Sequence, residues 1–132
     1  MACNGNKRYL VFTIMKRFAA LFLFFAGACT KKDEIAPVIS ILSPIENQVF
    51  SAGQTITIRA TVTDNESVHM VHVIVTDETG GHWVHSEEHV DGRTVEIVKT
   101  FITNAGKKYT ISIDAFDHDE NTTTKLMSIS SN

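Results

Sequence analysis

From residue 37 onward, apolar and polar residues alternate with a period of two, which is the pattern of a strand with one buried face. The clearest case is Thr55–Val62, where an isoleucine, alanine or valine follows each polar residue. The same pattern predicts strands at Val38–Leu42, Val49–Phe50, Thr55–Val62, Val68–Val75, His82–Val90, Val95–Ile102, Tyr109–Phe116 and Thr123–Ile129. Because no ten-residue segment of this region has a helical stripe, we expect an all-β domain.

Turn-forming residues separate these segments at near-regular spacing. They occur at Ala52-Gly53, Asp64-Asn65, Gly80-Gly81, Asp91-Gly92, Ala105-Gly106 and Asp117–Asn121. With the short Val49–Phe50 counted together with Val38–Leu42, the segments are seven short strands, and with such turns they predict an antiparallel β-sandwich over residues 37–132. In a meander of this kind, the turns at Asp64, Asp91 and Asp117–Asn121 share the end at which the first strand begins.

The first 28 residues have a different pattern, typical of a secretory signal peptide. Lys16-Arg17 precede an apolar run from Phe18 to Phe25, and the small residues Ala26-Gly27-Ala28 follow. A membrane span needs about 20 apolar residues, whereas only eleven lie between Phe18 and the polar residues after Cys29. We therefore expect a signal peptide at 1–28. Met15 is a second candidate start, because Met15-Lys16-Arg17 alone is a complete beginning for such a signal.

The end of this signal resembles the lipobox of bacterial lipoproteins, with Ala26 where that family usually has leucine. The resemblance implies that the Cys29 thiol is diacylglycerol-modified, that the chain is cut before Cys29, and that the new amino terminus is acylated. Several acyl chains anchor a protein stably in a bilayer, which a single chain does not. We expect residues 29–36 to be a lipidated tether.

The tether also carries features that bear on localisation. Thr30 stands where some lipoproteins carry the aspartate that retains them at the inner membrane, and Lys32-Asp33-Glu34 resembles the export signal of surface lipoproteins from the Bacteroidetes group. These resemblances imply an outer-membrane lipoprotein that faces the cell surface or the periplasm.

The charge of the chain after the expected cleavage point excludes one class of partner. Eight basic residues against fifteen acidic ones give residues 29–132 a formal charge of −7. Such a chain repels nucleic acid and anionic headgroups. The other cysteine, Cys3, lies before the cut, so we expect no disulfide within the domain.

The domain resembles bacterial immunoglobulin-like and cadherin-like modules over residues 37–131. The likeness is carried by Pro44–Phe50, Thr61–Asn65, Val68–Val75 and Tyr109–Asp117. It implies a seven-stranded immunoglobulin-like sandwich in which Tyr109 forms a tyrosine corner, with its hydroxyl tied back to the backbone. The cysteine pair of antibody domains is missing, and the only tryptophan, Trp83, follows the third strand rather than lying in it.

Five of the six histidines lie between residues 69 and 89. A tight hairpin at Gly80-Gly81 would set His72 opposite His89, and a four-residue loop would shift the pairs by two residues but keep the same face. Either register places His72, His85, Glu87 and His89 on one surface, where they are candidate ligands for Zn²⁺ or Cu²⁺. The alternatives are a solvated sheet face, or a patch with Trp83 that contacts a protein or glycan.

Acidic and amide residues gather in two turns expected at the same end of the sandwich. Asp64, Glu66, Asp117 and Asp119 are candidate ligands for Ca²⁺, which takes roughly six to eight oxygens. The alternative is that they are ordinary solvated turn residues, since turns favour Asp and Asn.

The sequence carries no catalytic motif of a hydrolase or phosphate-binding enzyme. We therefore expect a non-catalytic binding or structural module that requires no cofactor, anchored in the lipid bilayer through acylated Cys29, with an unidentified protein or glycan as its partner. A Zn²⁺- or Cu²⁺-binding envelope protein and a calcium-stabilised adhesion module are the two alternatives.

Overall fold

The computed structural model describes residues 31–132; the expected signal peptide and Cys29 lie outside these residues. The described chain forms strands and no helix, which confirms the all-β class. Helices capable of crossing a membrane are accordingly absent from residues 31–132. The strands are β1 (Val38–Ser43), β2 (Val49–Phe50), β3 (Thr55–Asp77), β4 (His82–Ile102), β5 (Lys108–Asp117) and β6 (Thr122–Ser131).

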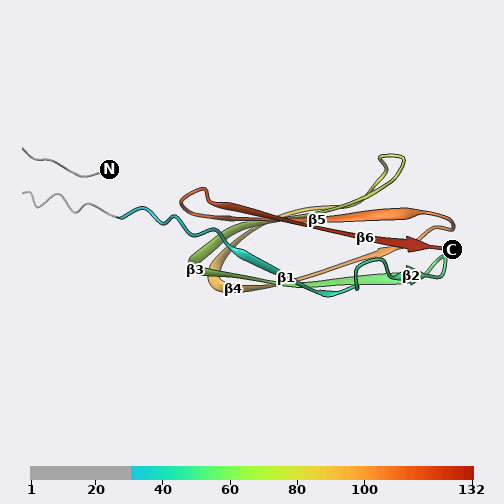
Figure 1. Cartoon of the computed structure of the whole chain (residues 1–132), viewed down its shortest axis with the longest axis horizontal. Coiled ribbons are helices and arrows are strands. Elements are labelled where there is room, and N and C mark those ends of the chain that lie inside the picture. The colour runs from blue at the N-terminus through green and yellow to red at the C-terminus, as the bar shows by residue number, and fades with distance from the viewer. Residues whose placement is uncertain (1–30) are drawn as a thin grey trace, which may run out of the picture. The chain divides into compact units, whose positions relative to one another are not determined.

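The strands form the two layers of a sandwich, seen edge-on in Figure 1. One layer contains β1, the first half of β3 and the second half of β4, paired antiparallel. The other contains the first half of β4, the second half of β3, β5 and β6, also antiparallel. The short β2 adds to β6 as a parallel neighbour, so the expectation of a wholly antiparallel sandwich is wrong at this edge.

The core lies between the layers and comes from the alternation seen in the sequence. Every second residue from Ile56 to Val62 in the first half of β3 is buried, as are Val68 and every second residue from Val71 to Val75 in its second half. They meet Ile97 and Phe101 of β4 and the inward residues of β5 and β6. Since every core residue lies between Ile39 and Ile129, a chain that begins at residue 30 or 31 contains the whole core and can fold without the residues before it.

The number of strands differs from the expected seven, because two pairs of predicted strands are each one long strand. β3 covers both Thr55–Val62 and Val68–Val75, and β4 covers both His82–Val90 and Val95–Ile102. At Asp64-Asn65 and Asp91-Gly92 the chain bends from one layer into the other and does not reverse. The two bends lie side by side, where the Ser67 hydroxyl donates a 2.7 Å hydrogen bond to Asp91 Oδ1 and accepts one of 3.0 Å from the Gly92 amide.

Tyr109 forms the tyrosine corner that the family resemblance implies. Its side chain is 1% exposed, and its hydroxyl accepts a 2.6 Å hydrogen bond from the Asn104 amide. This contact ties the start of β5 to the loop before it.

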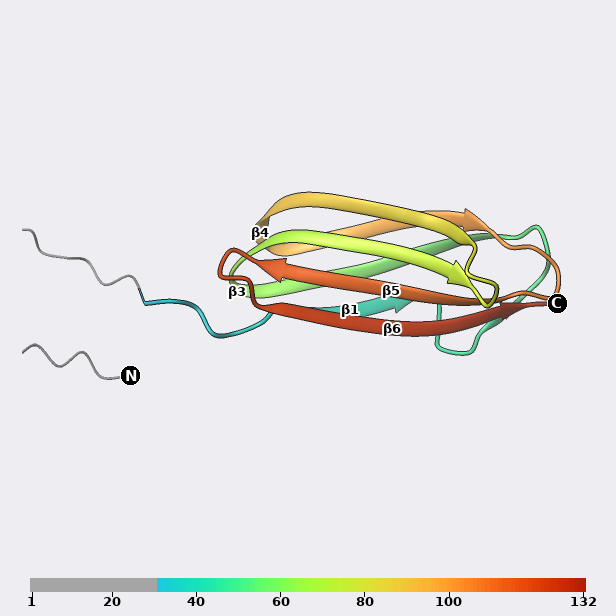
Figure 2. The ribbon, with the colours of Figure 1, turned by 90° about the horizontal axis from the view of Figure 1, so that it is seen from above.

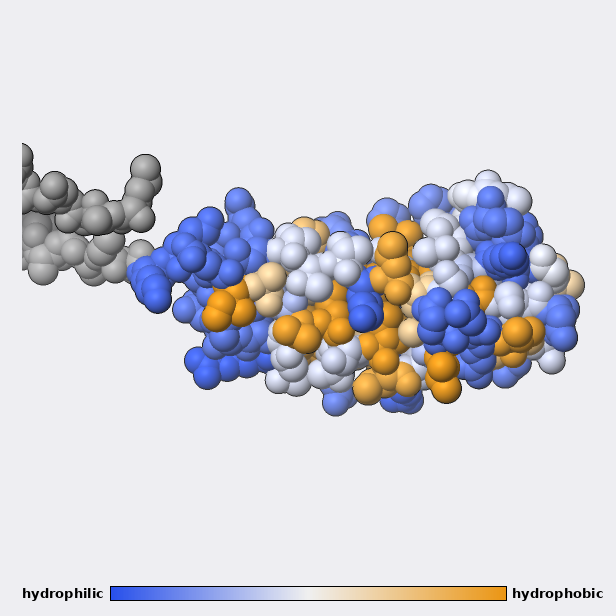
Figure 3. Space-filling view, in the orientation of Figure 1, coloured by the Kyte–Doolittle hydropathy of each residue, from blue (hydrophilic) through white to orange (hydrophobic). Residues whose placement is uncertain are grey.

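The turns separate to two opposite ends, as expected. The chain enters from residue 31 at the end that carries the β3 and β4 bends and the β5–β6 loop, and the β3–β4 turn lies at the other end (Figures 1 and 2). We call these the tethered end and the distal end. On the face of Figure 3, polar residues gather at the tethered end and hydrophobic residues around the middle.

The distal β3–β4 turn is organised by one carboxylate, that of Asp77, whose side chain is 5% exposed. Its Oδ1 accepts hydrogen bonds from the Thr79 hydroxyl (2.6 Å), the Thr79 amide and the Gly81 amide (both 2.9 Å). Its Oδ2 accepts one from Trp83 Nε1 at 3.2 Å and lies 3.2 Å from Lys107 Nζ. The hydrogen bond from the Thr79 hydroxyl, followed by that from the Gly81 amide, holds the pKa of Asp77 well below its usual range.

We expect Asp77→Asn to lower the melting temperature at pH 7 by several degrees, because an amide cannot accept all five contacts. A carboxyl whose pKa is lowered by folding stabilises the protein above its unfolded pKa of 3.8 and loses that effect as the pH falls further. The difference in melting temperature between wild type and variant should therefore shrink below about pH 4. Thermal unfolding followed by circular dichroism between pH 2.5 and 8 measures it. Glu96→Gln, on an exposed side chain of β4, is the control, and an equal loss in both variants would contradict this role for Asp77.

Candidate functional sites at the tethered end

Three segments meet at the tethered end: the tether from residue 31 to 37, the bend of β3, and the β5–β6 loop. Asp33 of the tether joins them. Its amide donates to Asp119 Oδ2 at 2.5 Å, its Oδ2 accepts from Asn65 Nδ2 at 2.8 Å, and its carbonyl oxygen accepts from Asn121 Nδ2 at 3.0 Å. The tether is therefore attached to both loops of this end.

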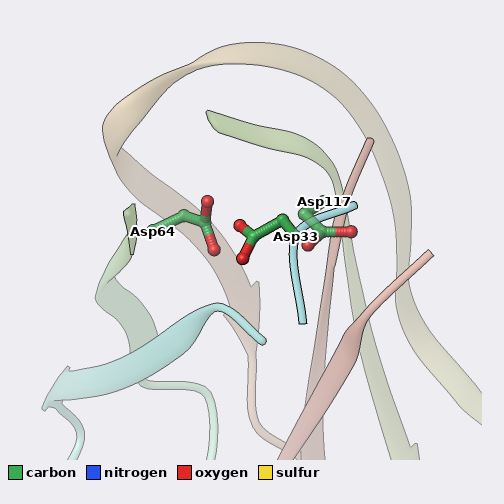
Figure 4. A group of neighbouring side chains, drawn as sticks. All are labelled: Asp33, Asp64 and Asp117. Carbon is green, nitrogen blue, oxygen red and sulfur yellow. The ribbon is translucent and has the colours of Figure 1, made fainter. Parts of the chain in front are cut away.

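Three carboxylates converge at this junction. Asp33, Asp64 and Asp117 each place one oxygen so that the three lie within 4.8 Å of one another. Figure 4 shows Asp33 between the other two, on the tether, with Asp64 on β3 and Asp117 at the end of β5. Asp117 is 4% exposed, so the group lies partly below the surface.

Most oxygens of this group have donors, but one does not. Asp117 Oδ1 accepts from the amides of Asp119 and Asn121 at 2.8 Å, and Asp117 Oδ2 accepts from Asn121 Nδ2 at 2.6 Å. Asp64 Oδ1 accepts from the amides of Glu66 and Ser67. Asp64 Oδ2 is buried and has no hydrogen-bond partner. Such an oxygen is costly unless a cation or a donor reaches it.

The observed group overlaps the predicted calcium ligands in part. Asp64 and Asp117 belong to the group, and Asp119 lies beside it and accepts a hydrogen bond from the Asp33 amide. Glu66 is exposed and lines a small pocket of about 140 Å³. The other residues that line this pocket are Asp33, Ser67, Asp117, His118 and Asp119. Asp33 was not among the predicted ligands. The available signal was its position, since a residue shortly before the first strand must lie at the end where that strand begins.

The histidine face forms on the second layer with the register of a four-residue loop. His72 lies opposite Glu87, Met70 opposite His89, and Ile74 opposite His85. The pairing expected from a tight hairpin is wrong by two residues, but the shared face is retained because the side-chain period is two. Glu87 lies between two of the histidines, with Oε2 3.4 Å from His72 Nε2 and Oε1 3.7 Å from His89 Nε2.

The other predicted member of this set lies elsewhere. The ring of His85 is nearest that of His82, with centroids 6.2 Å apart. His72, His85, Glu87 and His89 do not bring one ligand atom each within 4.8 Å; among the described residues only the aspartate group does so. Two histidines outside the predicted set adjoin it, since the ring of His69 is 5.4 Å from that of His89 and 4.4 Å from that of His118.

Trp83 does not form an exposed patch with these histidines. It is half-buried, its Nε1 donates to Asp77, and its ring packs edge-on against Tyr109 with centroids 5.4 Å apart. Trp83 therefore supports the distal turn. A surface that contacts a protein or glycan would not have Trp83 as its exposed centre.

The distal end carries a groove of about 480 Å³. It is lined by Asn47, Glu78, Lys108, Tyr109, Thr110, Ser128, Ile129 and Ser130. Hydrogen bonds from its own backbone amide and then from the Lys108 amide lower the pKa of Glu78. The groove is polar at its rim and presents both charges.

Comparison with solved structures shows the same fold at low sequence identity. The fibronectin(III)-like modules of Clostridium thermocellum CbhA match with a TM-score of 0.51 and 20% identity, over 74% of this chain and 48% of theirs, so this chain spans about half their length. A chain of the complex between zinc 2-glycoprotein and prolactin-inducible protein from human seminal plasma matches with a TM-score of 0.52 and 10% identity, over 80% of this chain and 99% of that one.

Comparison with curated proteins found no match. The family model described as bacterial Ig domain matches residues 37–126, which include β1 to β5 and the first half of β6. Together with the two-layer sandwich and the tyrosine corner, this match shows that the chain belongs to the bacterial Ig domain family.

Proposed function

We propose that this protein is a lipid-anchored, non-catalytic immunoglobulin-like module of the cell envelope. The observation that carries the proposal is the attachment of the tether to the domain. Asp33 is only four residues from Cys29 and is hydrogen-bonded to both loops of the tethered end. Four extended residues span at most about 14 Å, so an acylated Cys29 would hold this end close to the bilayer.

This arrangement directs the distal end away from the membrane. The groove between Glu78, Lys108 and Ser128 then lies where an extracellular or periplasmic partner can reach it. Its mixed charges and exposed hydroxyl and amide groups suit a polar partner, a protein or a glycan. Because a fold alone does not determine a function, the non-catalytic role depends on which side chains the domain brings together.

The side chains of the described residues support a non-catalytic role. A nucleophile activated by a base needs a direct hydrogen bond between the two. Between residues 31 and 132, no serine or threonine hydroxyl is hydrogen-bonded to a histidine. Three hydroxyls are hydrogen-bonded to carboxylates: Ser67 connects the two bends, Thr79 lies in the distal turn, and Thr124 connects β6 to β5.

Replacing the acylated residue tests the anchor. We expect Cys29→Ser to abolish processing that is sensitive to globomycin and to release the protein from the membrane fraction, because the serine hydroxyl is not a substrate for diacylglycerol transfer. Thr30→Ser is the matched control and should leave both unchanged. The measurement is fractionation with metabolic labelling by palmitate in a bacterial host that processes lipoproteins. A Cys29→Ser protein that stays in the membrane fraction would contradict the proposal.

A second candidate role is stabilisation by Ca²⁺ at the tethered end. The specific observation in its favour is the unpartnered buried oxygen of Asp64, which adjoins the carboxylates of Asp33 and Asp117. Three anions at this separation repel one another, and a hard cation with oxygen ligands relieves the repulsion. Carboxylates from the tether, β3 and β5 would then share one ion, and Ca²⁺ would hold the tether to the domain.

We expect millimolar Ca²⁺ to raise the melting temperature of residues 30–132 by several degrees relative to the same protein in EDTA, since a ligand at about 100 times its Kd stabilises by about 2.7 kcal/mol. Asp64→Asn should remove this shift. Asp91→Asn, at the neighbouring bend but outside the group, should retain it. Differential scanning calorimetry gives the result, and equal melting in Ca²⁺ and EDTA for wild type would refute the candidate role.

A further inference from the structure

His69 occupies an irregular position in β3, and this position decides where its ring lies. Val68 pairs with Gly92 and Asp117, whereas Met70 pairs with His89 and Phe116, so both ladders shift register across His69. Val68 and Val71 are both buried, at 0% and 1% exposure. Two residues, His69 and Met70, therefore lie between the inward-facing Val68 and Val71, whereas in a regular strand only one residue lies between two inward-facing side chains. His69 is therefore the extra residue of a β-bulge in the ladder with β5, where no residue lies between Phe116 and Asp117 to match it. In the ladder with β4 the extra residue lies on β4, since Val90 and Asp91 stand opposite His69 alone.

The bulge brings together histidines from three elements. The ring of His69 lies 4.4 Å from that of His118, in the β5–β6 loop, and 5.4 Å from that of His89, on β4. These histidines are distant in the sequence. Alternation counted back from Val71 would turn His69 toward the core, whereas the irregularity places its ring beside the other two. Bulges commonly re-aim a side chain at a functional site.

The surroundings of these rings suit a cation. The adjoining β5–β6 loop carries Asp117, Asp119 and Glu120, and residues 29–132 have a formal charge of −7, so the local potential attracts divalent ions. The side chain of His89 is 68% exposed and His118 is exposed. The nitrogens of the three rings do not lie within 4.8 Å of one another in the structure, as is also true of the set with His85. The exposed rings of His89 and His118 can rotate by a side-chain torsion at little cost, and this rotation would bring their nitrogens together on one ion.

Glu87 supplies the support that a metal-binding histidine needs. Its Oε1 lies 3.7 Å from His89 Nε2, and its Oε2 lies 3.4 Å from His72 Nε2, so the carboxylate lies between two imidazoles. The buried His72 Nε2 has no hydrogen-bond partner. A histidine that ligates a metal through one nitrogen usually donates its other N–H to a carboxylate or carbonyl, which fixes its tautomer. With Nε2 on the side of Glu87, His89 would bind the ion through Nδ1.

We propose that His69, His89 and His118 form a binding site for a divalent transition-metal ion, Zn²⁺ or Cu²⁺, with Glu87 orienting His89. Three imidazoles and a solvent molecule complete a four-coordinate Zn²⁺ site, and imidazole nitrogens are equally suited to Cu²⁺. This set differs from His72, His85, Glu87 and His89 because His69 and His118 take the place of His72 and His85. The site shares no residue with the anchor or the aspartate group and rests on neither, although His118 lines the same small pocket as Asp33 and Asp117.

Isothermal titration of tag-free residues 30–132 with ZnCl₂ and with CuCl₂ tests the proposal, in a buffer that contains Ca²⁺ so that the aspartate group is not available to the added metal. We expect one ion per chain with a dissociation constant in the micromolar range or below. His69→Ala and His118→Ala should each weaken binding at least tenfold. Circular dichroism melts would confirm that both variants remain folded.

Two control variants separate this site from its alternatives. His85→Ala should bind as wild type does, because the His85 ring lies beside His82 and outside the cluster. Asp64→Asn should also bind as wild type, because it alters only the aspartate group. Absence of binding at 1 mM metal by wild type, loss of binding in His85→Ala with retention in His118→Ala, or loss in Asp64→Asn would each overturn the proposal. The Ca²⁺ melting experiment is independent of all three results.

Discussion

The pairing of β3 with β4 along almost their whole length is the constraint on which the rest of the structure depends. The two strands form a ladder from Thr55 opposite Ile102 to Thr76 opposite His82, and both pass from one layer of the sandwich to the other. Since they remain paired, a bend in one must be matched by a bend in its partner. Ser67, Asp91 and Gly92 make the matching contact. The bulge at His69 follows directly after this crossing, and Asp64 directly precedes it. The positions of both candidate ion sites therefore depend on the place where β3 and β4 pass from one layer to the other.

Alternation in the sequence was enough to predict the strand class, the core positions and the faces, because burial of every second residue is a local signal that tertiary contacts rarely override. It was not enough to predict that β3 and β4 are continuous. Asp64-Asn65 and Asp91-Gly92 are residue pairs that favour turns, but the ladder between β3 and β4 is only interrupted there and resumes with Val68 opposite Gly92, so neither chain reverses. The hairpin register was wrong by two residues for a related reason. The Asp77 carboxylate holds a four-residue loop through Thr79 and Gly81, and a loop of this length has no unambiguous signature in the sequence.

The two candidate sites were predicted to different degrees. Asp64 and Asp117 could be predicted to lie together, because topology alone brings their loops to one end of a sandwich. Asp33 could not, because the path of the tether depends on three hydrogen bonds to residues more than thirty positions away. His69 was missed because a bulge interrupts the alternation on which the face assignment relied. Its sequence signal is the spacing of Val68 and Val71, three residues apart and both buried, and this spacing can be interpreted only once both valines are known to face inward.

The position of the acidic group relative to the membrane gives the tethered end a particular electrostatic problem. In the lipid-anchored arrangement proposed above, Asp33 would lie at most about 14 Å from Cys29, with one oxygen each of Asp64 and Asp117 within 4.8 Å of its carboxylate. Charges separated by more than about 8 Å are largely screened at physiological ionic strength, so anionic headgroups would repel these carboxylates mainly when the tether is not fully extended. A cation bound among the three carboxylates would reduce that repulsion and would also fix Asp33. Occupancy of the aspartate group would thus set both how close the domain stands to the membrane and how rigidly it projects.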